Sequence, residues 1–331
     1  MGAERSADEA DNAATDFPPV INGLDFLEST VELLTKTPAP SARDQKYAVI
    51  HLAAAFEVIL KARLEIEDPA LTWVKPDEFN EAKHRVGDFK SVQWEDTLKR
   101  VRQKCAPETQ LIEKPHVRAL VEMRNRIAHF GFAGTTAAVE VVTTPVLDFL
   151  VSFVHGDLLA LVPDRQVTRA EEIIDRVRPG LGKIGALVKQ RLAAAEALNA
   201  THVVRCLVCA ANSVPIEGGD VHIICVVCQT DFGSPADAAW FYSGTSAYEV
   251  MTDGGEYPVH EHNGFLCIGG AVTSMPTGKF ADGVETTTLL CLTCGEECEG
   301  VCGYCDRAVT TLAFPEAQMC GDCLDIRMER F

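Results

Sequence analysis

The chain has 331 residues, which is enough for two or three domains that each bury a core. Hydrophobic residues make up 47% and charged residues 24%, as in ordinary globular proteins, and no apolar run approaches the length that spans a bilayer. The acidic, small-residue start of the chain lacks the basic and apolar parts of a signal peptide. We therefore expect a cytoplasmic protein without membrane attachment.

The net charge of -18 is divided unevenly along the chain. Residues 1–200 hold 25 Lys and Arg against 30 Asp and Glu, a net charge of -5. Residues 201–331 hold 5 against 18, a net charge of -13. Of the 13 cysteines, Cys105 is alone in the first part and the other twelve follow residue 200. The two parts therefore predict two different kinds of structure.

The first part predicts a series of helices. Apolar residues recur at helical spacing in five stretches, namely 24–36, 42–67, 94–105, 115–129 and 145–161. Ser41 is a favoured N-cap for the second stretch, and Pro115 and Pro145 suit the first turns of the last two. We expect a connection with room for a short strand at 131–144, and further helix at 164–200 that is interrupted at Pro179.

A basic strip lies within this first part. Between residues 83 and 104 the basic residues are Lys83, Arg85, Lys90, Lys99, Arg100, Arg102 and Lys104. Asp88, Glu95 and Asp96 are the acidic residues of the same strip. The strip is either a surface that contacts phosphates or a solvated helix face.

Three polar residues gather near the end of the helix predicted at 115–129. Asn125 and His129 are four residues apart and share one face, and Arg124 lies one step earlier. His129 falls in the final turn before Gly131, where the negative end of the helix dipole favours positive charge. A fixed charge, an imidazole and an amide together suit chemistry on a phosphodiester. A solvated helix end with a capping histidine is the alternative.

Arg124, four further residues and His129 resemble the R-x4-H motif of HEPN domains, which are small helical bundles of ribonucleases and nucleotide-binding proteins. The resemblance covers residues 20–165, under half of the chain. It implies a metal-independent endoribonuclease whose two protomers join their motif helices in one cleft. In that cleft His129 would move protons, Arg124 would hold the phosphate, and Asn125 would orient the phosphate or the imidazole. HEPN ribonucleases commonly act as toxins or in antiviral defence.

Glu57 and Lys61 are candidate accessory residues, because a helix early in HEPN bundles often carries polar residues that face the motif. Their spacing is also that of an ordinary salt bridge between residues i and i+4 on a helix surface. Both interpretations stay open at the level of sequence.

The second part carries metal-ligand spacing. Cys206 and Cys209 form one C-x2-C pair, and Cys225 and Cys228 form another after 15 intervening residues. This is the spacing of a zinc ribbon, in which two tight turns supply four thiolates to one tetrahedral Zn²⁺. The reducing compartment and the odd number of cysteines argue against disulfides.

A second set of the same kind is Cys302 with Cys305 and Cys320 with Cys323, separated by 14 residues. Further candidate metal ligands lie close by in the sequence, namely Cys291, Cys294, Cys298, Cys267, His260 and His262. Cys291 and Cys294 either belong to a third site or pair with one of the later turns. Cys267 follows an apolar run and is either a ligand or a buried thiol of the core.

All-cysteine sites are closed and structural, so we expect Zn²⁺ to hold small units that bury little core. The acidic second part disfavours direct phosphate binding and favours a protein partner or a control element. We expect an α+β multidomain protein. Its predicted parts are a disordered tail (1–19), an all-α HEPN-like helical bundle (20–165), a helical connector (166–200) and a small β-rich zinc-ribbon region with two to three cysteine-rich sites (201–331).

Two functions follow from the sequence. The first is a homodimeric endoribonuclease that cleaves RNA by attack of the 2′-hydroxyl and is controlled by its zinc-ribbon half. The second is a non-catalytic helical dimerisation module whose zinc ribbons bind another protein.

Overall fold

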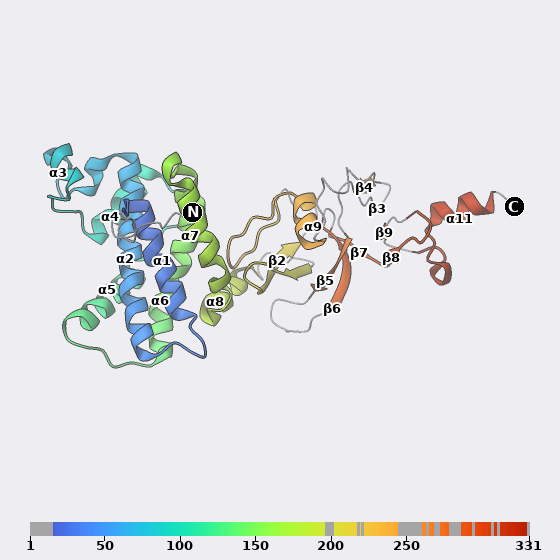
Figure 1. Ribbon diagram of the computed structural model, residues 1–331, viewed down its shortest axis with the longest axis horizontal. Helices are drawn as coiled ribbons and strands as arrows, with labels where there is room; N and C mark the ends of the chain where they lie inside the picture. The colour runs from blue at the N-terminus through green and yellow to red at the C-terminus, as the bar shows by residue number, and fades with distance from the viewer. Residues whose placement is uncertain are drawn as a thin grey trace, which may run out of the picture. The chain divides into compact units, whose positions relative to one another are not determined.

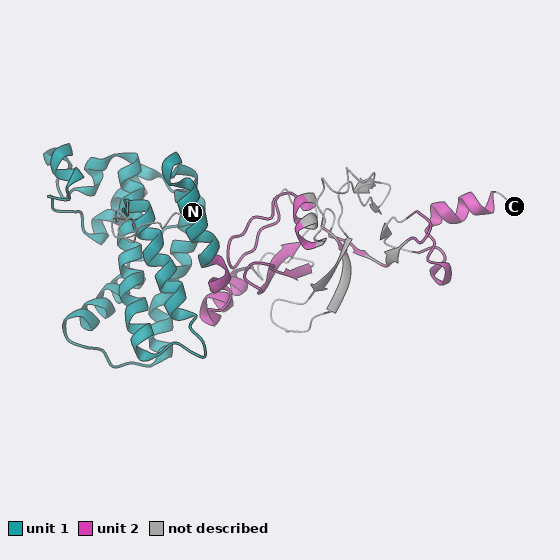
Figure 2. Cartoon of the chain, in the orientation of Figure 1, with its two compact units in different colours: residues 1–177 teal, residues 178–331 magenta. Residues whose placement is uncertain are grey.

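The computed structural model describes residues 16–195, 202–216, 219, 222–243, 260–262, 265–267, 272–277, 286–292, 295–305, 308–309 and 312–329. The chain divides into two compact units, residues 1–177 and 178–331 (Figure 2). The division falls inside the stretch that the sequence marks as a connector. The first unit is helical, and the strands lie in the second, so the predicted order of an α-rich part and a β-containing, cysteine-rich part is confirmed.

Seven helices begin among the described residues of the first unit. They are α1 (Pro19–Leu34), α2 (Ala42–Glu67), α3 (Glu81–Arg85), α4 (Trp94–Arg100), α5 (Lys114–His129), α6 (Thr136–Phe153) and α7 (Asp164–Leu181) (Figure 1). A π-helical turn at 101–105 extends α4, and the chain after α6 continues in short turns to residue 161.

Helix α2 is the centre of the first unit, and α1, α4, α5 and α6 all pack against it. Its start is fixed by Ser41, whose side chain accepts a hydrogen bond from the Asp44 backbone N–H while the Asp44 carboxylate accepts one from the Ser41 backbone. Helix α1 comes close to α2 because residue 23 is glycine. A Cβ at Gly23 would lie only 2.7 Å from Cγ1 of Ile59.

The core lies between these helices. Its largest fully buried side chains include Leu24, Leu27, Leu52, Phe56, Ile59, Leu60, Leu64, Leu120, Leu147 and Phe153. Helix α5 contributes Val117, Leu120 and Ile127, which recur at helical spacing on one face. The motif residues Arg124, Asn125 and His129, in the last turns of α5, are exposed to solvent.

Helix α6 begins earlier than predicted, because 136–144 is helical and holds no strand. The Thr135 side chain accepts a hydrogen bond from the Ala138 backbone N–H at 3.2 Å and caps the helix. Buried Val139 and Thr143 hold the β-branched segment in the core. Pro145 thus lies inside the helix, where it removes the hydrogen bond to the residue four positions earlier. The backbone carbonyl of Val141 therefore lacks its usual helical donor. Val141 is 74% exposed, so water can donate to this carbonyl instead.

Two further predicted boundaries were wrong. Helix α1 begins at Pro19, before the predicted start at residue 24, because proline suits a first helical turn. Helix α7 continues through Pro179 to Leu181, and the chain leaves the helix only at residues 182–184. Tertiary contacts hold this last turn, since Leu181 is fully buried.

By length and composition, Thr136–Leu161 is apolar enough to cross a membrane, contrary to our expectation that no stretch would be. In its most apolar window, 56% of the residues are buried inside the protein, and core helices pass the same test.

The second unit contains short strands and helices. Among its described residues, the helices that begin in this unit are α8 (Gly185–Ala195), α9 (Pro235–Ser243) and α11 (Gly321–Met328). One sheet has the order β2-β1-β5-β6-β7, formed by Asn212–Ile216, His202–Arg205, Val272–Thr277, Thr286–Cys291 and Glu297–Cys298. Another has the order β4-β3-β9-β8, formed by Phe265–Cys267, His260–His262, Ala308–Val309 and Gly300–Val301. The hairpin of β1 and β2 encloses the first C-x2-C turn.

Candidate functional site

The motif residues lie in the last two turns of α5 and are exposed. Arg124, Asn125 and His129 all face solvent. Nη1 of Arg124 donates a hydrogen bond to Oδ1 of Asn125 at 2.9 Å. This bond uses one of the five guanidinium N–H donors and fixes the direction of the others, which remain suited to an anion such as phosphate.

The helix end beside His129 is sharply defined. The backbone N–H groups of Phe130 and Gly131 both donate to the Arg126 carbonyl, at 2.9 and 2.8 Å. Gly131 has φ of 112°, a conformation that L side chains rarely adopt, so the chain can turn away at this position. The Phe130 side chain is left 93% exposed next to His129. A large exposed apolar side chain beside the motif is a feature of interaction surfaces.

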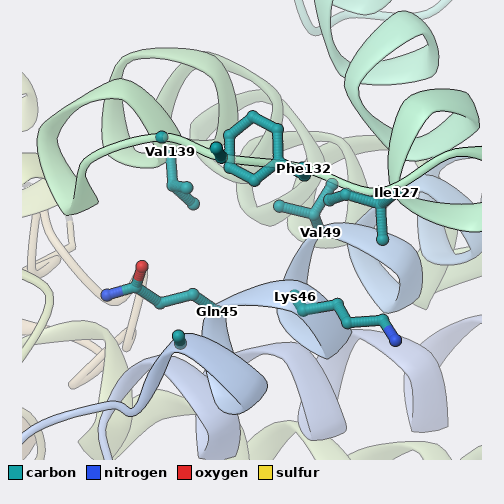
Figure 3. A pocket seen from close by; sticks show the side chains of 10 residues that line it. Gln45, Lys46, Val49, Ile127, Phe132 and Val139 are labelled. Carbon is teal, nitrogen blue, oxygen red and sulfur yellow. The ribbon is translucent and has the colours of Figure 1, made fainter.

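A pocket of about 370 Å³ lies next to this helix end (Figure 3). Its lining residues come from the start of α2, the end of α5, the following loop and the start of α6, namely Ala42, Gln45, Lys46, Val49, Ile127, Gly131, Phe132, Ala133, Gly134 and Val139. The sequence did not predict this pocket, because its walls come from segments that are about 90 positions apart in the chain. No local pattern of residues indicates that these segments meet.

The candidate accessory residues form the predicted salt bridge. Nζ of Lys61 lies 2.5 Å from Oε1 of Glu57 and also donates to Oγ of Ser91 at 2.9 Å. Lys61 thus ties the segment before α4 to α2, which accounts for the pair without a catalytic role.

The basic strip is only partly available to a ligand. Arg100 donates to the backbone carbonyls of Leu71, Trp73 and Val74 and so holds a loop in place. Arg85 is paired with Glu81 at 3.1 Å. The remaining basic residues of the strip are exposed or partly exposed in the structure.

The first four predicted metal ligands come together as a closed, buried cluster. The Sγ atoms of Cys206, Cys209, Cys225 and Cys228 lie within 4.8 Å of one another. The Cys206–Cys228 and Cys209–Cys225 sulfur atoms are 3.7 and 3.8 Å apart. Tetrahedral Zn²⁺ with Zn–S bonds of about 2.3 Å needs sulfur atoms about 3.8 Å apart, whereas a disulfide needs about 2.05 Å. The donor set therefore fits a four-thiolate metal.

Hydrogen bonds among the thiols of this cluster shift their pKa values in opposite directions. Hydrogen bonding to Cys206 raises the pKa of the Cys209 thiol. Hydrogen bonds from Cys206, Cys209 and Cys225 lower the pKa of the Cys228 thiol. A metal ion binds thiolates and not thiols, so its binding here would release protons and weaken as the pH falls.

Polar side chains surround the same sulfur atoms. Oγ of Ser213 lies 3.0 Å from Sγ of Cys225, and Oγ1 of Thr230 lies 3.0 Å from Sγ of Cys228. The backbone N–H of Cys228 donates to Sγ of Cys225 at 3.4 Å. Such hydrogen bonds stabilise the negative charge that thiolates bring to a metal.

Helix α8 and the turn before it support this cluster, which the cysteine spacing did not reveal. Nη1 of buried Arg191 donates to the carbonyls of Val226 and Val227, at 3.3 and 2.9 Å, inside the second C-x2-C turn. Gly182 lies so close to the first turn that a Cβ there would be 2.0 Å from the Cys209 carbonyl oxygen. The cluster and α8 therefore form one packed element within the second unit.

The second predicted quartet is also assembled. The Sγ atoms of Cys302, Cys305, Cys320 and Cys323 lie within 4.8 Å of one another, and those of Cys305 and Cys320 are 3.7 Å apart. Burial opposes ionisation of Cys302, but backbone N–H groups of Cys320, Tyr304 and Cys305 outweigh it and lower the pKa of this thiol to about 6. Cys305 and Cys323 are only partly buried, so this quartet is more open than the first.

The third set of candidate ligands falls outside the described side chains. Cys294 lies outside the described residues, and for His260, His262, Cys267, Cys291 and Cys298 the structure describes the backbone alone. In that backbone, His260 lies opposite Cys267 across β3 and β4, and Leu289 lies opposite Cys298 across β6 and β7. Whether they form a third metal site therefore stays a prediction.

Comparison with known proteins does not assign this arrangement to a family. No family model matches the chain, and neither the curated proteins nor the solved structures contain a match to it. The function of the exposed motif and of the two cysteine quartets therefore has to be inferred from their chemistry.

Proposed function

We propose that the helical unit is a metal-independent endoribonuclease of the HEPN type, and that the cysteine-rich unit is its metal-stabilised control or partner-binding element. The observation that carries the proposal is the exposed cluster of Arg124, Asn125 and His129 at one helix end, with Arg124 hydrogen bonded to Asn125. None of the three side chains is needed to fill the core.

The proposed reaction uses the side chains of this motif from two protomers. His129 takes the proton of a ribose 2′-hydroxyl or gives one to the leaving 5′-oxygen. Arg124 binds the phosphate and stabilises its added negative charge in the transition state, while Asn125 holds the guanidinium in position. The products are a 2′,3′-cyclic phosphate and a 5′-hydroxyl.

A single imidazole cannot act as base and acid at once, so a homodimer with two motifs in one cleft suits this chemistry. The exposed Phe130 beside His129 offers an apolar contact for such a dimer. Four-thiolate quartets leave no open position for substrate, which supports a structural role for Zn²⁺ there. Control in a toxin or antiviral system is the biological role that the resemblance implies.

The test is cleavage of RNA by His129→Ala and Arg124→Lys proteins. Loss of the imidazole should slow turnover by about a hundred- to ten-thousandfold, the usual range for a general acid–base group. Arg124→Lys should also be impaired, since an ammonium lacks the planar fork of a guanidinium. His116→Ala is the matched control, because His116 is exposed on the same helix away from the motif. Circular dichroism and thermal melting of each variant would show whether lost activity merely follows lost folding, in which case the motif is structural.

The second measurement concerns the attacking group. RNA with a single 2′-deoxyribose at the scission site should resist cleavage at that site, because the nucleophile is missing. Cleavage there at an unchanged rate would exclude attack by the 2′-hydroxyl.

The alternative function is a non-catalytic dimerisation module whose acidic cysteine-rich half binds a protein. The net charge of -13 over residues 201–331 favours it. RNA cleavage that depends on His129 in folded protein would rule it out, and a stable dimer without cleavage of any RNA would favour it.

A further inference from the structure

The pocket next to the motif has the size and the walls of a small-ligand site. Its volume of about 370 Å³ lies at the lower end of the range for ligand pockets, which suits one flat ring system and not a large ligand. Val49, Ile127 and Val139 give it apolar walls, and all three are more than nine-tenths buried. Figure 3 shows Gln45 and Lys46 of α2 facing Val139 and Phe132 across the hollow.

Polar groups stand at the edge of these walls. Nε2 of Gln45 donates to Oγ1 of Thr136 at 2.9 Å, which fixes the amide beside the pocket. Its carbonyl oxygen then offers an acceptor to the N–H groups of a base. Lys46 is exposed at the same edge and can meet a phosphate.

The wall formed by the loop after α5 is held by contacts within the first unit. The Phe132 ring rests on the backbone of Gly134, where a Cβ would lie 2.4 Å from the ring. The Arg126 guanidinium carbon lies 6.0 Å from the centre of the same ring. Gly131 supplies the turn that brings Phe132 back over α2. An aromatic ring at a preformed pocket is a surface on which a base can stack.

The surroundings are basic although the chain is strongly acidic. The segments 42–49 and 122–139, which carry the pocket residues, hold four basic residues, Arg43, Lys46, Arg124 and Arg126. Their acidic residues are Asp44 and Glu122. Asp44 is paired with Lys36 at 2.6 Å, so its charge is largely neutralised. The local excess of positive charge complements a polyanion.

The helix geometry relates the pocket to the motif. Successive residues on an α-helix are about 100° apart, so His129 lies roughly on the opposite side of α5 from Ile127, which lines the pocket. Arg124 lies about 60° from Ile127 and is hydrogen bonded to Asn125, which is on the His129 side. Around the helix axis, Arg124 thus lies between the pocket and the imidazole of His129. A base in the pocket would belong to a neighbour of the attacked nucleotide and not to that nucleotide itself.

We propose that this pocket binds a nucleobase of the RNA substrate, from a nucleotide adjacent to the scissile phosphate, and thereby sets the base preference of cleavage. The proposal rests on the proposed ribonuclease function. It assigns the base to the Phe132 wall and the Gln45 amide, and the neighbouring phosphates to Lys46 and Arg124.

The experiment measures binding separately from cleavage. Full-length His129→Ala protein is titrated into four fluorescein-labelled homopolymeric RNA decamers, and fluorescence anisotropy reports affinity. The blocking change is Ala133→Trp, because Ala133 is exposed and lines the pocket, so a large ring there fills the mouth without disturbing the core. The control is Ala137→Trp, an exposed alanine that does not line it.

We expect the unblocked protein to prefer one decamer, and Ala133→Trp to weaken that complex by about tenfold and to remove the preference. Ala137→Trp should change affinity by less than about twofold. Lys46→Gln should lower the slope of log affinity against log salt by about 0.7, the value for one contact to a single-strand phosphate.

Unchanged affinity and preference in Ala133→Trp would overturn the pocket assignment while leaving the ribonuclease proposal intact, provided that the protein with His129 still cleaves RNA. If 5′-mononucleotides bind and are blocked by Ala133→Trp while the RNA decamers are unaffected, the pocket holds a free nucleotide and the RNA assignment is wrong. If the decamers neither bind nor are cleaved, both proposals fail together.

Discussion

The two units offset the entropy cost of folding in different ways. The helical unit buries large side chains such as Phe56, Leu120 and Phe153 almost completely. In the second unit the buried residues include Cys206, Cys225, Cys228 and Cys302, which gather at the quartets. The difference predicts that the first unit depends on packing, whereas the second depends on metal–sulfur bonds that a chelator would remove.

The same comparison separates the chemistry of the two units. The exposed motif and the basic pocket edge lie in the helical unit, where positive and negative charges are nearly balanced over residues 1–200. The cysteine-rich region is acidic, and each four-thiolate Zn²⁺ site would add negative charge. RNA is therefore expected to meet the first unit, and the second is better suited to a basic protein surface.

Metal removal should give the largest effect and should affect only the second unit. Elemental analysis should find at least two zinc ions per chain, one for each described quartet. Strong chelation should unfold the quartets, since structural zinc sites contribute apparent binding energies of about 10–16 kcal/mol. The helical signal in circular dichroism and the RNA cleavage should largely persist. Collapse of the α-helical signal on chelation would show that the comparison of the two units is wrong.

Truncation of a core side chain in the helical unit should lower the stability of that unit and leave the metal sites of the second unit unchanged. Leu120→Ala should cost about 2–5 kcal/mol of stability, because Leu120 is fully buried between α5 and its neighbours. Thermal melting would show the loss, and the zinc content should not change. Val141→Ala is the control, since Val141 is 74% exposed and its change should stay within about 0.5 kcal/mol.

A smaller effect is expected where α8 supports the first quartet. Arg191→Met should weaken this quartet by about 1–3 kcal/mol, because the carbonyls of Val226 and Val227 lose a charged donor. The readout is the chelator concentration that removes half of the zinc. Lys189 is exposed on the same helix, so Lys189→Met should leave that chelator concentration unchanged. Equal behaviour of the two variants would mean that α8 does not support the metal.

The smallest effect concerns the cap of α2. Hydrogen bonds from Lys36 and Ser41 lower the pKa of the Asp44 carboxyl to about 2, below its value in the unfolded chain. The carboxylate therefore stabilises the fold above the unfolded pKa of about 3.9, and this stabilisation is lost as the pH falls through about 2. Asp44→Asn should lower the melting temperature slightly at neutral pH and make no difference at pH below about 2. An equal difference at both pH values would show that the charge of Asp44 is not the cause.

Much of this protein is set by local chemistry that can be recognised in the sequence. Ser41 and Asp44 fix the start of α2, and the position of Gly131 marks the end of α5. The C-x2-C spacing was enough to predict both described quartets, because two residues between cysteines can bring both sulfur atoms to one metal. The common face of Asn125 and His129 near the end of α5 follows from their spacing of four residues in the same way.

Other features were decided only when distant segments packed together. Thr136–Thr144 is helical because Val139 and Thr143 are buried in the core, although their β-branched side chains favour strands. The contacts of Arg191 and Gly182 with the first quartet join segments that no local spacing connects. The pocket beside α5 likewise needs Gln45 and Phe132 on opposite walls. Local patterns determined the cap, the turns and the ligand sets, whereas burial and long-range contacts determined where helices continue and which surfaces become sites.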